Sequence, residues 1–221
     1  DQLDKLGVEA VAVNLLFSFL RPEQERHIAD CLGDRWFVSC ASAILAEVRE
    51  YERGMATWLN ASVGPVISRY LKRLQARLPD CGISVMQSAS ATIAADQAAD
   101  QAVRLLLSGT AGGLAAAMGI AGQTQSPKLM SFDMGGTSTD VALLNGRIPL
   151  TSHSRIGSWP LSIPTVDIHT IGAGGGSIAW VDKLNRLQVG PESAGSEPGP
   201  VCYARGGLNP AVTDADLLLG K

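Results

Sequence analysis

Apolar residues recur along the chain in two kinds of pattern, short continuous runs and longer stretches with helical spacing. Short apolar runs bounded by turn residues predict buried strands, whereas apolar positions three and four residues apart predict helices. Strands are expected over residues 9–19, 36–40, 82–86 and 128–133. Helices are expected over residues 22–32, 42–78, 94–107 and 111–121. This mixture of strands and helices predicts an α/β fold.

The helical pattern over residues 42–78 has three features of its own. Pro65 lacks a backbone donor and is expected to kink or interrupt the helix. Charged residues over 47–53 are expected to form ion pairs on the helix surface. The apolar stripe predicted to face the core comprises Val66, Tyr70, Leu71, Leu74 and Leu78.

A Gly/Ala-rich helix is expected over residues 111–121, and small side chains favour close packing against a neighbour. The segment 108–113 opens this helix, so its free N–H groups offer an alternative role in binding an anion. We prefer the packing interpretation, because small residues continue along the whole helix.

Turn signals become frequent in the second half of the chain. Asn145-Gly146 is the strongest of them and is expected to join a strand over residues 139–144 to another over 147–150. A second hairpin is expected over residues 177–189, and a short helix near residues 214–219.

Composition and charge narrow the function classes. The 221 residues carry a net charge of −3 and a sequence pI near 5.6, which indicates neither nucleic acid nor an anionic membrane as a partner. No apolar run reaches the ~20 residues of a membrane helix, and no signal-peptide pattern is found. Cys31, Cys40, Cys81 and Cys202 lack disulfide or zinc spacing, which predicts buried thiols and a cytoplasmic protein.

The segment Phe132–Val141 carries the most informative chemistry. Apolar runs enter and leave it, which predicts a strand, a tight turn and a second strand. Gly135 and Gly136 can adopt positive φ, and consecutive N–H groups in such a turn form a concavity that suits a phosphate. Hydroxyl donors follow at Thr137, Ser138 and Thr139. The turn is therefore predicted to bind the phosphates of a nucleotide.

Two aspartates, Asp133 and Asp140, flank this turn. A carboxylate repels a phosphate, so their placement favours a bridging cation, and hydrated Mg²⁺ is the obvious one. We expect both to be metal ligands and catalytic residues. An ordinary Gly-Gly hairpin is the alternative, but it does not account for carboxylates on both sides of three hydroxyls.

A second candidate is the glycine-rich segment Gly172–Ser177. It fails as a dinucleotide fingerprint, because Ser177 stands where the third glycine is required and the following residues predict a strand. We interpret it as a flexible loop beside the nucleotide or the substrate, with Gly174, Gly175 and Gly176 as cofactor-binding residues. A plain surface loop is the alternative.

Asp167 and His169 lie two residues apart, and so on one face if the segment is extended. A carboxylate with an imidazole can bind a divalent metal or form an acid/base pair. We expect Asp167 as a metal ligand and His169 as a catalytic residue, with a purely structural pair as the alternative.

The chain is similar to a known family in seven segments, which occur in family order. These segments are Arg49–Arg53, Leu105–Gly109, Asp133–Val141, Asp167–Ser177, Gly190–Gly195, Pro198–Tyr203 and Val212–Ala215. They resemble the A subunit of the ATP-dependent hydantoinase/5-oxoprolinase/acetone carboxylase family, within the sugar kinase–actin ATPase superfamily.

The resemblance implies a ribonuclease-H-like, actin-like ATPase fold with a mixed sheet, of which this chain is a central part. Residues 1–40 would end an N-terminal region, and residues 41–221 would form part of the core domain. Family members carry an earlier Asp-x-Gly-Gly-Thr loop and a later adenosine loop, and they work with a B-type subunit. We therefore expect a hetero-oligomer, and no ATP turnover by this segment alone.

The implied function is hydrolysis of a cyclic amide, such as a hydantoin, a lactam or 5-oxoproline, after ATP and Mg²⁺ phosphorylate its carbonyl oxygen. Acetone-type carboxylation is the variant. Asp133 and Asp140 would hold Mg²⁺, and residues 135–139 would hold the β- and γ-phosphates. A sugar- or acetate-kinase relative is the weaker interpretation, because residues 167–177 and 190–203 argue against it.

Four places depart from the family pattern. Ala41-Ser42-Ala43 and Ala89-Ser90-Ala91 replace loops that are more polar in relatives, Thr110 stands where proline is usual, and Ala204 stands where glycine is usual. The phosphate loop itself is intact. A non-catalytic nucleotide-binding or structural domain therefore remains an open alternative.

Overall fold

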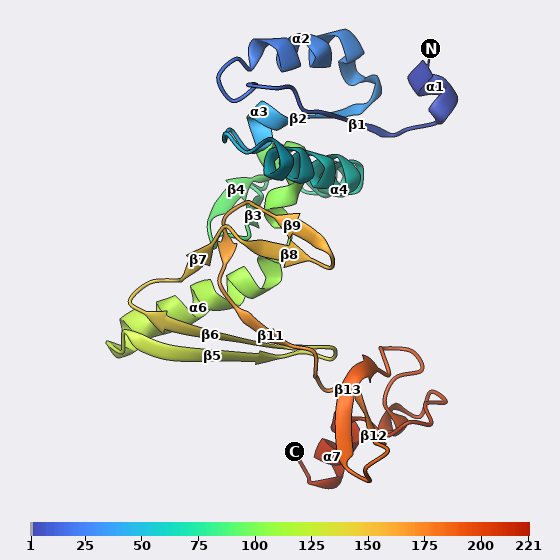
Figure 1. The fold of residues 1–221 in the computed structure, drawn as a ribbon. Helices are drawn as coiled ribbons and strands as arrows, with labels where there is room; N and C mark the ends of the chain where they lie inside the picture. The colour runs from blue at the N-terminus through green and yellow to red at the C-terminus, as the bar shows by residue number, and fades with distance from the viewer. Residues whose placement is uncertain (1) are drawn as a thin grey trace. The chain divides into compact units, whose positions relative to one another are not determined.

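The computed structural model describes residues 2–221, which group into two compact units. The first extends to Ala115 and takes in Pro149–Val166, and the second comprises Ala116–Ile148 and Asp167–Lys221. Both contain helices and strands, so the α/β prediction is confirmed (Figure 1). The described strands form sheets of two or three strands, with one parallel pair among antiparallel ones. The boundary expected at residue 40 stays a prediction.

In the first unit, a parallel strand pair packs with a long helix. β1 (Ala10–Val13) and β2 (Phe37–Cys40) are joined through α2 (Glu23–Leu32), and both contact α4 (Glu50–Arg77). The other elements are α1 (Gln2–Leu6), η1 (Gly33–Arg35), α3 (Ala41–Ile44), β3 (Ser84–Met86), β4 (Thr92–Ala94), α5 (Ala95–Asp100), η2 (Ala102–Leu105), β7 (Leu150–Thr151), β8 (Ser154–Ile156), β9 (Trp159–Leu161) and β10 (Thr165–Val166).

The strand predicted over residues 9–19 is shorter in the structure, because β1 ends at Val13. The residues that follow bond to buried side chains instead of to a sheet. The Leu15 N–H donates to the Glu25 carboxylate (2.8 Å), and its carbonyl accepts from Arg53 (3.2 Å). Burial raises the pKa of Glu25, but hydrogen bonds from Leu15 and Ser42 outweigh it and leave that pKa below its ordinary value.

α4 differs from the predicted helix in its start and in its buried face. The single helix predicted over residues 42–78 is two helices in the structure. α3 ends at Ile44, and α4 begins at Glu50 and continues through Pro65 without interruption. Leu71 is buried, but Val66 and Tyr70 are 60% and 61% exposed, so the predicted apolar stripe is wrong. The buried face instead consists largely of small and polar residues, which a hydropathy pattern does not mark.

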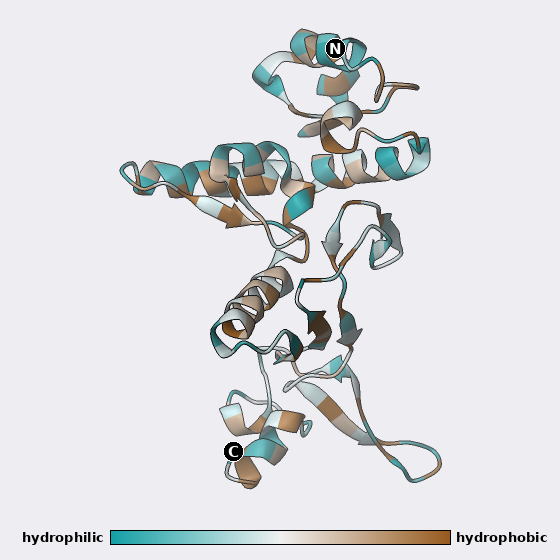
Figure 2. Ribbon diagram, turned by 90° about the vertical axis from the view of Figure 1, so that its left-hand side faces the viewer, coloured by the Kyte–Doolittle hydropathy of each residue, from teal (hydrophilic) through white to brown (hydrophobic). Residues whose placement is uncertain are grey.

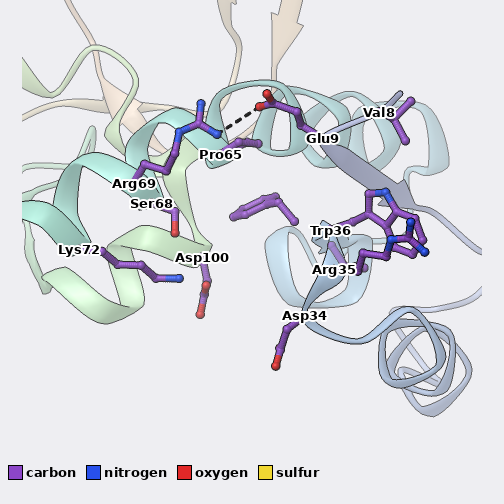
Figure 3. A pocket seen from close by; sticks show the side chains of 12 residues that line it. Val8, Glu9, Asp34, Arg35, Trp36, Pro65, Ser68, Arg69, Lys72 and Asp100 are labelled. Carbon is purple, nitrogen blue, oxygen red and sulfur yellow. Dashed lines mark hydrogen bonds and ion pairs between the residues drawn. The ribbon is translucent and has the colours of Figure 1, made fainter. Parts of the chain in front are cut away.

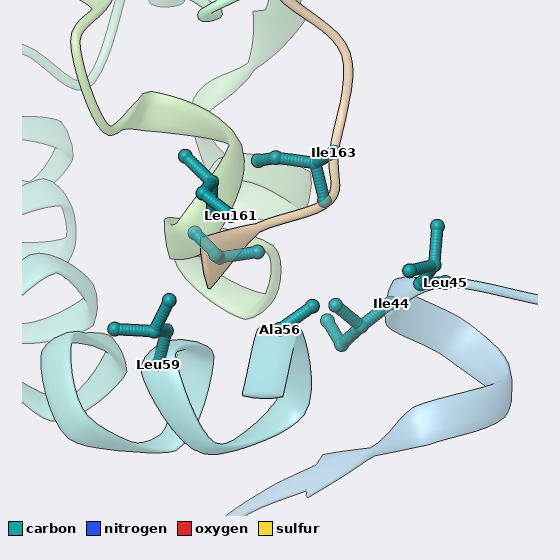
Figure 4. Packing of buried hydrophobic residues seen from close by; sticks show 7 residues of the cluster. Ile44, Leu45, Ala56, Leu59, Leu161 and Ile163 are labelled. Carbon is teal, nitrogen blue, oxygen red and sulfur yellow. The ribbon is translucent and has the colours of Figure 1, made fainter. Parts of the chain in front are cut away.

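The core of the first unit forms where α4 meets two other segments (Figure 4). Ala56 and Leu59 of α4 pack with Ile44, with Leu161 at the end of β9 and with Ile163 just after it. The remaining members of this cluster are Leu45 and Val103. Burying such side chains contributes about 1.5–3 kcal/mol each, so this cluster fixes α4 within the unit.

The second unit is built on an antiparallel sheet and a hairpin. β5 (Lys128–Met134) pairs with β6 (Thr139–Asn145), which also pairs with β11 (His169–Ile171). β12 (Ser177–Val181) and β13 (Leu187–Ser193) form the expected second hairpin. η3 (Val201–Tyr203) and α7 (Val212–Leu218) follow. The predicted strand–turn–strand and the final helix are confirmed.

The hairpin predicted at Asn145-Gly146 is wrong. Gly146 does adopt a positive φ of 69°, as a turn glycine should, but its N–H donates to the Pro127 carbonyl. The other edge of β6 is taken by β11, so residues 147–150 do not pair back onto β6.

The Gly/Ala helix is confirmed as α6 (Ser108–Thr124), and Figure 2 shows it largely white to brown. The close packing expected of its glycines is absent from the described residues. A Cβ built on Gly109, Gly112, Gly113, Gly119 or Gly122 would meet nothing within 4 Å. Among the described helices, none is long and apolar enough to cross a bilayer.

The cysteines only partly match the prediction of buried thiols. All four are free, but Cys31 and Cys81 are exposed, and Cys40 and Cys202 are half-buried. Burial raises the pKa of the Cys40 thiol, and the charges of Glu25 and Asp30 raise it further.

Candidate functional site

The predicted phosphate loop, called the phosphate loop below, is the turn between β5 and β6. The Gly135 N–H donates to the Ser138 carbonyl (2.9 Å) and closes the turn. In the described part of the chain, the N–H groups of Gly136, Thr137 and Ser138 have no acceptor. Gly135, Gly136 and Thr137 are exposed, and Ser138 is half-buried. Three successive donors without partners at a turn form a binding surface for an anion.

Asp133 and Asp140 lie directly opposite each other in the register of β5 and β6. Thr170 of β11 is the next residue in the same cross-strand row, and its hydroxyl donates to the Asp140 carboxylate (2.7 Å). Residues paired across strands share one face of a sheet, so this face carries two carboxylates at the end of the phosphate loop.

His169 and Asp167 do not join this pair. His169 lies opposite Val141, one position along β6 from Asp140, and therefore on the other face of the sheet. Asp167 precedes β11 and is exposed. The described residues contain no group of three or more His, Cys, Asp or Glu side chains arranged to hold a metal. Asp133, Asp140 and Asp167 thus do not form one ligand set here.

The glycine-rich segment packs against the phosphate loop, backbone to backbone. The Gly175 N–H donates to the Gly135 carbonyl (2.9 Å), and the Gly176 N–H donates to the Gly136 carbonyl (2.6 Å). The Gly174 N–H donates to the Ser177 hydroxyl (2.8 Å). Because all three N–H groups already have protein acceptors, these glycines support the phosphate loop rather than offer donors of their own.

Close approach, not flexibility, accounts for glycine at position 174. A Cβ there would lie 2.5 Å from the Gly135 carbonyl oxygen and 2.8 Å from the Ser138 nitrogen. Both are backbone atoms, which cannot rotate away as the end of a side chain can. Gly174 and Gly176 are buried. The interpretation of this segment as a flexible loop is therefore wrong.

Two threonines hold the glycine-rich segment from its other sides. The buried Thr139 hydroxyl donates to the Ala173 carbonyl (2.7 Å), which gives this hydroxyl a protein partner in place of a phosphate. Thr213 of α7 donates twice to the Gly175 carbonyl, through its N–H (2.8 Å) and its hydroxyl (2.7 Å).

Asp214, the next residue of α7, organises the terminal loops. Its carboxylate accepts N–H groups from Ala211 (2.7 Å), Cys202 (2.7 Å) and Val201 (3.2 Å). These bonds, the one from Ala211 foremost, lower the pKa of Asp214 to about 2. Neither Thr213 nor Asp214 was assigned a role from the sequence. The signals in the sequence were the family-like segment Val212–Ala215 and an acidic residue in the first turn of a short helix.

Two charged hollows lie in the first unit. One of about 630 Å³ lies beside β1, β2 and α4 (Figure 3), and one of about 790 Å³ includes Cys40 and Ser42. In the first, Arg69 pairs with Glu9 (3.2 Å), and Lys72 shares the hollow with Asp100. Because acidic and basic side chains both line this hollow, its charge does not favour either an anionic or a cationic ligand.

Comparison with known proteins agrees with the motif analysis. The hydantoinase/oxoprolinase family model matches residues 53–221. Caprolactamase subunit alpha of Pseudomonas jessenii is 36% identical over 229 residues, which cover 100% of this chain and 33% of that subunit. 5-Oxoprolinase 1 of Arabidopsis thaliana is also 36% identical, over 99% of this chain and 17% of the relative.

Solved structures give the same result. The crystal structure of the ATP-dependent caprolactamase from Pseudomonas jessenii matches with a TM-score of 0.78 and 32% identity, over 99% of this chain and 33% of that one. A nucleotide-free acetone carboxylase structure matches with a TM-score of 0.76 and 26% identity. The match covers 99% of this chain and 32% of the carboxylase chain. The chain thus spans about a third of the length of these proteins.

Proposed function

This chain belongs to the hydantoinase/oxoprolinase family, and from that premise we propose that its phosphate loop binds ATP for an ATP-dependent cyclic amide hydrolase. The observation that carries the proposal is the row of three N–H groups, Gly136 to Ser138, that have no acceptor among the described residues. Backbone donors fixed in position stabilise charge on phosphoryl oxygens, which is the main contribution that a protein makes to phosphoryl transfer.

The pair Asp133 and Asp140 is the proposed site for Mg²⁺. Its donors are all carboxylate oxygens, which this ion prefers, and the pair adjoins the phosphate loop. When bound, Mg²⁺ neutralises charge on the β- and γ-phosphate oxygens. The Thr170 hydroxyl orients the Asp140 carboxylate through its hydrogen bond. His169 lies on the other face of the sheet and Asp167 precedes β11, so both stay outside the proposed site.

The proposed substrate is a cyclic amide, whose carbonyl oxygen would accept the phosphoryl group before hydrolysis. Similarity to a caprolactamase subunit and to 5-oxoprolinases supports this class. We also propose a partner subunit, because relatives named as subunits include caprolactamase subunit alpha and the acetophenone carboxylase gamma subunit of Aromatoleum aromaticum, 33% identical. The carboxylase relatives make ketone carboxylation the second reaction to test.

Calorimetry on the full-length protein tests nucleotide binding, with Mg·ATP titrated into the wild type and into Asp133→Ala. We expect binding in the wild type and a large loss in the variant. ADP formation is then followed with 5-oxoproline, a hydantoin, caprolactam or acetone present, with the partner subunit added. The absence of Mg·ATP binding to folded wild type would contradict the proposal. Binding without turnover on any substrate would favour the non-catalytic alternative.

A further inference from the structure

Thr213 donates two hydrogen bonds to the glycine-rich segment, both to the Gly175 carbonyl. Its N–H (2.8 Å) and its hydroxyl (2.7 Å) both donate to that oxygen, and the side chain is half-buried. The Gly175 carbonyl shares a peptide unit with the Gly176 N–H. That N–H donates in turn to the Gly136 carbonyl (2.6 Å) in the phosphate loop. Thr213 is therefore one peptide unit away from the turn.

The Gly136 carbonyl in turn shares its peptide unit with the Thr137 N–H, one of the three donors without an acceptor. The same holds one residue earlier. The Gly175 N–H donates to the Gly135 carbonyl, and that carbonyl shares its peptide unit with the Gly136 N–H, another of the three donors without an acceptor. These peptide bonds are trans. In a planar trans peptide the N–H points away from the carbonyl.

Holding both carbonyls on the side of the glycine-rich segment therefore directs both N–H groups to the opposite side. The arrangement also polarises the chain of donors, because a peptide unit that accepts at its carbonyl donates more strongly through its N–H. Without these bonds, a turn of two glycines can rotate its peptide planes at little steric cost.

We propose that Thr213 is a positioning residue for nucleotide binding, which acts through the Gly175–Gly176 peptide to aim the Gly136 and Thr137 N–H groups at the phosphates. This inference rests on the proposed function of the phosphate loop. Thr213 itself touches no phosphate. Its effect therefore falls on ligands that carry β- and γ-phosphates, and not on the nucleoside part of the ligand.

The test compares Thr213→Val, which keeps the shape and the N–H but removes the hydroxyl, with Thr213→Ser, which restores it. Calorimetry on the full-length protein measures affinity for Mg·ATP and for AMP, and thermal unfolding measures stability. The loss of one such hydrogen bond is expected to weaken Mg·ATP binding about five- to tenfold. Thr213→Ser is expected to stay within about twofold of the wild type, and AMP affinity to be unchanged in both.

The matched control is Thr57→Val in the first unit. The Thr57 hydroxyl is fully buried and donates to the Arg53 carbonyl (2.7 Å), so this variant also loses one hydroxyl–carbonyl bond. It is expected to lower the unfolding temperature without weakening Mg·ATP binding. If Thr213→Val does not fold, Thr213→Ala replaces it in the comparison with Thr213→Ser.

The two proposals fail in different ways. Wild-type affinity for Mg·ATP in Thr213→Val would overturn the positioning role and leave the proposed function standing. An equal loss for Mg·ATP and AMP would also overturn it, because the effect would then not depend on the β- and γ-phosphates. A wild type that binds no nucleotide would contradict the proposed function, and the positioning role with it.

Discussion

Asp133 and Asp140 lie directly opposite each other across β5 and β6 and share one face of the sheet. Like charges in directly opposed positions destabilise a strand pair by roughly 0.2–1 kcal/mol. Only Asp140 receives a hydrogen bond, from Thr170, among the described residues. The sequence therefore keeps an unfavourable pair beside the phosphate loop, and a bound cation would relieve it.

Asp133→Asn is expected to have opposite effects on stability and on binding. In the absence of Mg²⁺ and nucleotide it should raise the free energy of unfolding by a few tenths of a kcal/mol, because the repulsion is removed. It should also weaken Mg·ATP binding at least about tenfold, because an Mg²⁺ ligand is lost. Urea denaturation and calorimetry on the full-length protein measure the two quantities.

Asp167→Asn is the control, because Asp167 is exposed and lies outside this pair. It is expected to change neither quantity appreciably. A loss of Mg·ATP binding in Asp167→Asn as large as that in Asp133→Asn would restore the three-carboxylate metal site predicted from the sequence.

The order of elements could be predicted because each depends on local pattern. The strand–turn–strand around Gly135-Gly136 and the hairpin after Ser177 follow from apolar runs and turn residues. Pairing between strands that are not joined by a short turn could not be predicted. Asn145-Gly146 signals a turn, but β11, more than 20 residues later, supplies the neighbour of β6. The face occupied by His169 depends on that register, and a shift of one residue reverses it.

Gly174→Ala tests whether the glycine-rich segment supports the phosphate loop by close contact. The added methyl would approach three backbone atoms of residues 135–138 at 2.5–2.8 Å, so the segment or the loop must move. We expect the free energy of unfolding to fall by about 1–3 kcal/mol. We expect the affinity for Mg·ATP to fall by much more than about tenfold. Thermal unfolding and calorimetry give the two values.

Gly172→Ala is the matched control in the same segment. A Cβ there meets nothing within 4 Å, and its φ is not in the left-handed region. Stability should change by less than about 0.5 kcal/mol. If both glycine variants bind Mg·ATP as the wild type does, backbone contact at position 174 does not shape the phosphate loop.

The carboxylate pair of the candidate site could be predicted from the sequence, but the roles of Gly174 and Ala204 could not. Glycine in a sequence does not distinguish a mobile loop from a tight contact, and only the neighbours of Gly174 decide between them. Ala204, at the position where the family resemblance predicts glycine, adopts a left-handed backbone with φ 54°. That conformation is one in which a Cβ is unfavourable, so it accounts for the expectation of glycine there. The carboxylate pair was predictable from spacing alone, since a short turn brings its flanks together.

Arg53→Lys tests a buried cation that the sequence placed on a helix surface. The Arg53 guanidinium is fully buried and donates to Asn14 (3.1 Å), to the Leu15 carbonyl (3.2 Å) and to the Glu47 carbonyl (2.5 Å). Lysine cannot reproduce three bonds in a planar fork. We expect a destabilisation of about 2–4 kcal/mol, measured by urea denaturation.

Arg49→Lys serves as its control, because the Arg49 side chain is largely exposed and has one long contact with Glu52 (3.9 Å). It should change stability by less than about 0.5 kcal/mol. Equal effects of the two lysine variants would mean that Arg53 does not tie the Asn14–Leu15 segment to α4.

Asp214→Asn is expected to destabilise the protein in a way that depends on pH. Hydrogen bonds from Ala211, Cys202 and Val201 lower the pKa of Asp214 from its ordinary 3.8 to about 2. A carboxyl whose pKa falls on folding stabilises the folded state above the pKa of the unfolded chain, and this contribution is lost as the pH falls through the folded value. The loss of stability in Asp214→Asn should therefore be constant above about pH 5 and shrink between about pH 4 and pH 2.

Thermal unfolding of wild type and variant across this pH range measures the difference. Asp216→Asn removes the same charge from α7 without removing an acceptor of described N–H groups, and should change stability little at neutral pH. A difference between wild type and Asp214→Asn that stays the same down to pH 2 would mean that the ionised carboxylate is not what holds Val201 and Cys202 to α7. The terminal loops, and with them the approach of Thr213 to Gly175, would then be held by contacts other than the charge of Asp214.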